Sequence, residues 1–104
     1  MARLDEIAEG LATVLANSPS PEPLNVDLRG QSPKEATLLV RAVIDACERR
    51  GAPISLVCVH PELGADLMKL YGSGIGYEGV PIQESPETSD SLQFFRFVPQ
   101  RSIR

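Results

Sequence analysis

A single stretch near the middle of the chain most constrains the fold, because it carries both a helix start and a helix stop. Ser32 and Glu35 form a capping box, and Pro33 fits the first helical position. Gly51 supplies the left-handed residue at which helices commonly end. The apolar run ISLVCV (54–59) follows almost at once, and its length and composition predict a central strand. A capped helix that leads into such a strand indicates a β-α-β arrangement.

The segment ahead of this helix alternates between apolar and polar side chains. Residues 24–29 (LNVDLR) therefore predict a strand that is buried on one face only. Its leucines and valine would face the core. Asp27 and Arg29 would share the opposite, exposed face, because residues two apart in a strand point the same way.

The remaining segments complete the order β-α-β-α-β-β. Residues 60–72 have helical spacing, whereas 80–84 and 91–98 are strand-like and are joined by a turn-rich connection. We therefore predict an α/β (α+β) fold, a two-layer sandwich with an extra N-terminal helix. Its sheet would be mixed and four-stranded, parallel at the two crossovers and closed by an antiparallel hairpin.

Helical periodicity also predicts which faces the two internal helices bury. In the longer helix the buried stripe consists of Ala36, Leu39, Val40, Val43, Ala46 and Cys47. In the shorter helix it consists of Leu63, Leu67, Leu70 and Tyr71. Thr37 is among the polar residues that we expect to face water.

An amphipathic helix is predicted over residues 1–17, ahead of the sandwich. A proline-rich connector (18–23) separates it from the sandwich domain (24–98), and a basic tail occupies 99–104. The helix could fold back on its own chain or dock on a second copy to form a homodimer. We favour docking on the open face of the sheet, within the chain ahead of a domain swap.

Composition and charge argue against several classes of function. The net charge is −4, and no basic stripe of the kind that binds nucleic acid runs through the chain. Cys47 and Cys58 lie in apolar contexts without metal-binding or redox spacing, which predicts two small core residues in a reducing compartment. No apolar run has the form of a signal peptide or the length of a membrane span. We therefore expect a cytoplasmic protein without metal or cofactor and without a membrane partner.

One glycine-rich stretch matches the sequence of a cofactor-binding motif but lacks the flanking elements that the motif requires. GIGYEG (74–79) has the GxGxxG pattern of dinucleotide-binding proteins. That pattern requires a strand before it and a helix after it, so that the helix N-terminus meets the pyrophosphate. Here a predicted helix precedes the glycines and a predicted strand follows, so we reject the cofactor interpretation. A small-ligand site under the loop 72–79 is a weaker hypothesis.

His60 and the pair Arg49–Arg50 are further candidates. His60 follows the central strand and precedes a helix, the position at which α/β sheets commonly bind ligands. The alternative is that His60 caps its own helix or is merely exposed. Arg49 and Arg50 form the main basic cluster outside the C-terminal tail.

Some of these segments together resemble the small MutS-related (Smr) domain. The resemblance covers about residues 24–98 and rests on VDLRGQSPKEA (26–36), on the long amphipathic helix, and on the strand that ends in Val59–His60. It implies a fold like the C-terminal domain of translation initiation factor three, and nucleic-acid binding or nicking. The family has a Gly-Lys-Gly loop after its histidine, where this chain has Pro61, Glu62 and Leu63.

Two hypotheses follow from these observations. The first is a small, non-catalytic interaction module whose partner is a protein or a second copy of the chain. The alternative is a degenerate Smr-like nucleic-acid-binding domain or nuclease. In either case the candidate contact residues are Asp27, Arg29, His60, Arg49 and Arg50.

Overall fold

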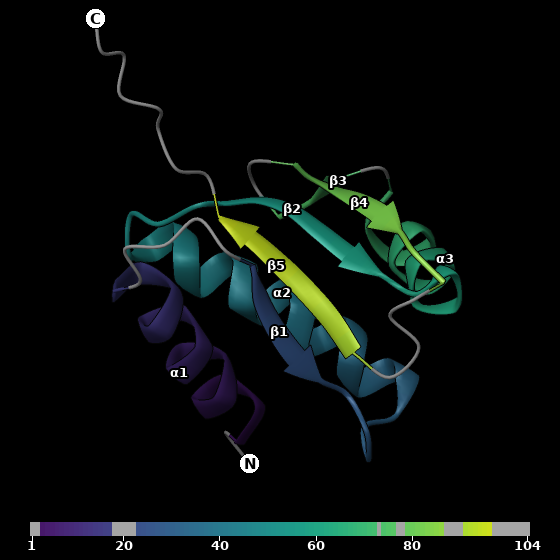
Figure 1. Cartoon of the computed structure of the whole chain (residues 1–104), viewed down its shortest axis with the longest axis horizontal. Helices are drawn as coiled ribbons and strands as arrows, with labels where there is room; N and C mark the ends of the chain where they lie inside the picture. The colour runs from purple at the N-terminus through teal and green to yellow at the C-terminus, as the bar shows by residue number, and fades with distance from the viewer. Residues whose placement is uncertain (1–2, 18–22, 73, 77–78, 87–90, 97–104) are drawn as a thin grey trace, which may run out of the picture.

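The predicted fold class is confirmed, with one strand more than expected. The computed structural model describes residues 3–17, 23–72, 74–76, 79–86 and 91–96 (Figure 1). In chain order its elements are α1 (Arg3–Asn17), β1 (Leu24–Asp27), α2 (Pro33–Arg49), β2 (Ile54–Val59), α3 (Pro61–Tyr71), β3 (Gly74–Ile75), β4 (Val80–Glu84) and β5 (Ser91–Arg96). The additional strand is β3, which lies in the predicted loop 72–79. The basic tail and most of the connector lie outside the described residues.

The start of α2 is built as its sequence predicts. The Ser32 hydroxyl accepts a hydrogen bond from the Glu35 amide at 3.1 Å, and the Glu35 carboxylate accepts one from the Ser32 amide at 3.0 Å. Two of the helix's first amide groups are thereby satisfied. Gly51 has φ of 72°, the left-handed conformation that a helix stop requires.

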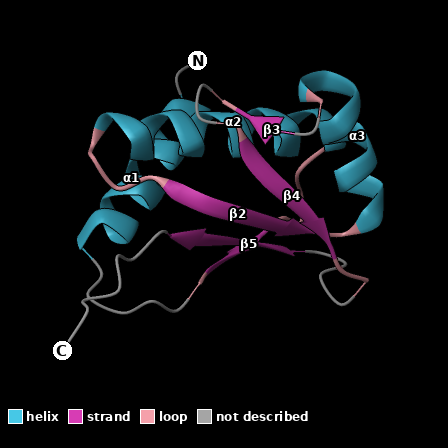
Figure 2. Ribbon diagram, turned by 90° about the horizontal axis from the view of Figure 1, so that it is seen from above, coloured by secondary structure: helices cyan, strands magenta, loops and turns pink. Residues whose placement is uncertain are grey.

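The buried face of α2 is wider than its predicted stripe. Every residue of the predicted stripe is buried, and Thr37 and Ile44 are buried as well. The expectation that Thr37 faces water is therefore wrong: its hydroxyl donates to the Lys34 carbonyl at 2.7 Å, which satisfies the group without solvent. Figure 2 gives the reason, because α2 lies between α1 and α3 in the helical layer and also covers the sheet.

The sheet has the order β1-β5-β2-β4-β3. The strand β4 pairs parallel to β2, as the crossover rule requires, whereas β5 pairs antiparallel to both β1 and β2. The predicted hairpin of the last two strands does not form, because β5 inserts between β1 and β2. Leu92 and Phe94 of β5 are fully buried, so this strand gains most from a central position.

The N-terminal helix folds back on its own chain, but not onto the open face of the sheet. It lies beside α2 in the helical layer (Figure 2), where Ala8, Ala12 and Leu15 are buried. Arg49 and Arg50 of α2 both form salt bridges with Glu9, and the Arg96 side chain donates to the Leu15 carbonyl. The two alanines let the helices approach closely, and the charged contacts fix α1 on this side. The predicted docking of α1 on the open sheet face is therefore wrong.

We expect Val43→Asp to abolish cooperative unfolding, because Val43 is fully buried and the change places an unpaired charge in the core. Thermal unfolding followed by circular dichroism measures this. Leu38→Asp is the matched control on the same helix: Leu38 is 44% exposed, and the variant should melt cooperatively near the wild-type temperature. A cooperative, near-wild-type melt of Val43→Asp would contradict the observed orientation of α2.

A pair of neighbouring residues tests the docking of α1. Leu15 is buried and Val14 is 54% exposed. We expect Leu15→Ala to lower the free energy of unfolding by about 2–5 kcal/mol, and Val14→Ala to change it by no more than about 0.5 kcal/mol. Chemical denaturation measures both values, and light scattering of the intact protein determines whether a homodimer forms. Equal effects of the two substitutions would mean that α1 does not pack in this way.

Candidate functional site

Asp27 and Arg29 form a local ion pair just after β1. The Arg29 Nη2 atom lies 2.8 Å from Asp27 Oδ2, and the backbone amide of Arg29 donates to Asp27 Oδ1 at 2.9 Å. The Arg29 side chain, and next its backbone amide, hold the pKa of Asp27 at about 2. Both side chains are exposed, whereas the neighbouring Val26 is buried on the other face of the strand. The prediction that both side chains are exposed is confirmed, but β1 ends at Asp27 and Arg29 lies in the turn that follows, so the two residues do not share a strand face. The ion pair links the end of the strand to this turn.

His60 is the N-cap of α3. Its Nδ1 atom accepts a hydrogen bond from the Glu62 amide at 3.3 Å, and Pro61 takes the first helical position. The histidine therefore has a structural role at the start of α3, which was the alternative left open by the sequence.

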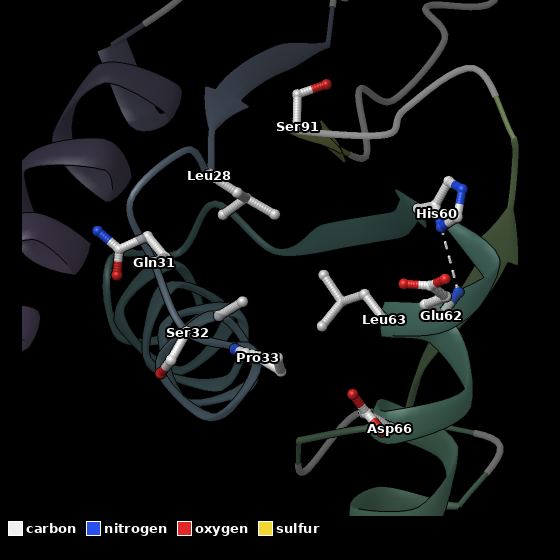
Figure 3. Close-up of a pocket in the computed structure, with 10 residues that line it drawn as sticks. Leu28, Gln31, Ser32, Pro33, His60, Glu62, Leu63, Asp66 and Ser91 are labelled. Atoms are coloured by element: carbon white, nitrogen blue, oxygen red, sulfur yellow. Dashed lines mark hydrogen bonds between the residues drawn. The ribbon is translucent and has the colours of Figure 1, made fainter.

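A cavity of about 180 Å³ lies beside His60, between the starts of α2 and α3. Figure 3 shows that residues from the β1–α2 connection face residues of α3 across it. Its lining consists of Leu28, Gln31, Ser32, Pro33, Ala36, His60, Glu62, Leu63, Asp66 and Ser91. The position, outside the carboxyl ends of β1 and β2, is the one at which α/β sheets commonly bind ligands.

The charges of this cavity do not suit a phosphate. Glu62 and Asp66 lie one turn apart on α3, and among the residues that the structure describes no lysine or arginine belongs to the lining. The N-termini of two helices favour an anion, but two carboxylates oppose it at close range. Among the described residues, no group of three or more histidine, cysteine, aspartate or glutamate side chains could hold a metal ion. The cavity thus combines an apolar floor with a negative rim.

The order of the strands keeps Asp27 apart from His60. Asp27 pairs with Ser91 of β5, and β5 separates β1 from β2. Two strand spacings amount to about 10 Å between the backbones. Asp27 does not belong to the lining of the cavity, whereas His60 does. The two residues therefore do not make an acid–base pair.

Arg49 and Arg50 lie at the other end of α2. A helix of this length separates them from the cavity by about 25 Å. Hydrogen bonds from Arg50 and Arg49 lower the pKa of Glu9, the carboxylate that both arginines contact. These arginines attach α1 to α2. The candidate contact residues are thus distributed over three separate places.

The GxGxxG pattern lies where β3 and β4 approach each other closely, and a glycine there leaves room for the two backbones. A Cβ atom on Gly74 would lie 2.8 Å from the Gly79 Cα atom, so only glycine fits there. A helix precedes the pattern and a strand follows it, which accords with rejecting a dinucleotide site. Ile75 is fully buried, and a Cβ atom on Gly76 would lie 3.0 Å from the Ile44 side chain of α2. Ile75 and Gly76 thus pack directly on the protein, which leaves the small-ligand hypothesis without support among the described residues of this loop.

A second hollow, which the sequence did not indicate, runs between α2 and α3. This α2–α3 groove has a volume of about 490 Å³ and is lined by Pro33, Lys34, Thr37, Leu38, Asp66, Lys69, Leu70 and Tyr71. Leu70 is 60% exposed, so its predicted place in the buried stripe of α3 is wrong. The buried residues of α3 are Leu63, Gly64 and Leu67, and no strand residue is among those that line the groove in the described part of the chain.

Tyr71 forms part of the groove and is held from α2. The Arg41 guanidinium lies 5.6 Å from the centre of the Tyr71 ring and also pairs with Asp45 at 3.0 Å. The ring is thereby fixed between the two helices. In the sequence, the only sign of the groove was that Leu38 is an apolar residue outside the predicted stripe of its helix.

Comparison of the chain with family models, with curated proteins and with solved structures gave no match. The resemblance to the small MutS-related domain therefore stays a prediction that rests on the residues quoted for it. Within the described part of the chain, no helix has both the length and the apolar character needed to cross a membrane.

The pKa of Asp27 provides a direct test of its ion pair. We expect an NMR titration of the Asp27 carboxylate to give a pKa of about 2, and Arg29→Gln to move it up towards the ordinary value of 3.8. Because the folded-state pKa is lowered, the pair contributes stability above pH 3.8 and loses it as the pH falls towards 2. Arg41→Gln, which removes a separate ion pair, should leave this titration unchanged. An Asp27 pKa that does not respond to Arg29→Gln would disprove the pairing.

Proposed function

We propose that this protein is a small, non-catalytic interaction module that binds a protein partner through the α2–α3 groove. The observation that carries the proposal is the exposure of Leu38 and Leu70, 44% and 60% respectively, in one apolar groove. Single exposed leucines are ordinary on a protein surface, but apolar side chains gathered in one hollow indicate an interaction site. The two free cysteines, Cys47 and Cys58, are buried, which supports a place in the reducing cytoplasm.

Three side chains of types that can perform catalysis are engaged in local structure. His60 caps α3, and Asp27 pairs with Arg29. Ser32, the hydroxyl nearest the start of α2 in the cavity, accepts the capping hydrogen bond of that helix. No two of these residues are arranged as a nucleophile and its base. This supports a binding role over a catalytic one.

The nucleic-acid alternative receives less support from the charges. Arg29, Arg49 and Arg50 each pair with a carboxylate of the same chain, so a phosphate would have to compete with Asp27 or Glu9. The loop that would approach a phosphate in the Smr-like hypothesis carries Glu62 instead of a lysine. Both features weaken the electrostatic term on which non-specific nucleic-acid binding depends.

A quantitative pull-down from native lysate tests the proposed site. Leu38→Asp and Leu70→Asp should each reduce capture of a specific partner by about tenfold or more, because each leucine buried at an interface contributes about 1.5–3 kcal/mol. Val14→Asp is the matched control, since Val14 is equally exposed but lies on α1, outside the groove lining.

The pull-down is compared with binding of labelled single- and double-stranded oligonucleotides at about 50 mM salt, where phosphate contacts are strongest. Capture that is the same for wild type and both groove variants would contradict the proposal. Steeply salt-dependent oligonucleotide binding would favour the nucleic-acid alternative instead.

A further inference from the structure

We propose that the α2–α3 groove takes an acidic amphipathic helix of a partner protein. This inference rests on the proposed function, because it concerns the same groove. It adds the chemistry of the occupant, which follows from the shape of the groove, from its charges, and from the way α1 already packs on the other flank of α2.

The shape of the groove suits two turns of a helix. Its α2 wall presents Lys34, Thr37, Leu38 and, through its contact with Tyr71, Arg41. These residues have the spacing i, i+3, i+4 and i+7, which covers about 10 Å along the helix axis. An amphipathic helix uses apolar side chains at the same spacing when it lies in a groove. Leu38 from one wall and Leu70 from the other would contact those side chains.

The charges of the groove favour an acidic occupant. Its lining includes two lysines, Lys34 and Lys69, against one carboxylate, Asp66, in a chain whose net charge is −4. Both lysines are exposed, so each can reach a carboxylate beside the apolar contacts. Arg41 adds little net charge, since it pairs with Asp45. Complementary charge at the edge of an apolar site sets the preference between partners.

The other flank of α2 already holds a helix of this kind. The acidic residues of α1 are Asp5, Glu6 and Glu9, and its alanines pack inward. Glu9 meets Arg49 and Arg50, basic side chains at the edge of the contact. Leu38 also lines the hollow between α1 and α2, so it borders both flanks. Thus α2 binds an acidic amphipathic helix on one side and presents a similar apolar surface with basic edges on the other.

Synthetic helical peptides test the inference on the full-length protein. The probe has sixteen residues, with leucines at the i, i+4 and i+7 positions of one face and glutamates beside them. Its matched counterpart carries lysines in place of the glutamates, and a third peptide keeps the glutamates but replaces the leucines with serine. Fluorescence anisotropy of the labelled peptides at about 50 mM salt measures binding.

We expect the acidic peptide to bind about fivefold or more tightly than the basic one, as two exposed charge pairs would give. The double variant Lys34→Glu/Lys69→Glu should reverse this preference. Leu38→Asp should weaken binding of the acidic peptide about tenfold or more, whereas Val14→Asp should leave it unchanged.

Each alternative outcome has a distinct meaning. Equal binding of the acidic and basic peptides, both lost in Leu38→Asp, would overturn the acidic occupant and leave the groove in place. Equal binding of the serine peptide would overturn the amphipathic requirement. If no peptide binds and the groove variants capture lysate proteins as the wild type does, the proposed function itself fails. A dimer that Leu38→Asp dissociates in sedimentation would make a second copy the occupant and overturn the inference.

Discussion

Burial of α2 on three sides is the constraint on which the rest of the structure depends. Val40, Val43 and Cys47 are fully buried against the sheet and the neighbouring helices. Burial raises the pKa of the Cys47 thiol to about 11, so this cysteine is a neutral core group at physiological pH rather than a nucleophile. A helix packed on so many sides determines where α1 and α3 can lie. The grooves between the helices are consequences of that arrangement.

Several arginines of this protein make contacts within the chain. Arg49 and Arg50 attach α1, Arg29 stabilises the turn after β1, and Arg41 holds Tyr71. Arginine is also common at phosphate sites, which is why the sequence alone left a nucleic-acid partner open. An arginine that is paired with a carboxylate or an aromatic ring of the same chain is less available to a phosphate.

The position of β5 has a similar consequence for chemistry. Had β1 and β2 been neighbours, Asp27 and His60 would have ended adjacent strands at one edge of the sheet. With β5 between them, Asp27 lies next to Ser91, and His60 belongs to a separate cavity with Glu62 and Asp66. The sequence indicated Glu62 only as a departure from the Gly-Lys-Gly loop and did not indicate Asp66. The role of both carboxylates depends on the N-terminus of α2, which lies opposite them only in the folded chain (Figure 3).

The sequence by itself determined the local elements, because caps, periodicity and alternation act over a few residues. Ser32, Glu35 and Gly51 bound α2, and His60 and Pro61 start α3. Alternation places Val26 inside and Asp27 outside in β1. Only the tertiary structure decided the order of the strands, the place of α1 and the exposure of Leu70. These depend on contacts between segments far apart in the chain: β5 with β1 and β2, and Glu9 with Arg49 and Arg50. Periodicity in the sequence predicts that a helix has an apolar face. Which residues of that face are buried depends on which other helices and strands pack against it.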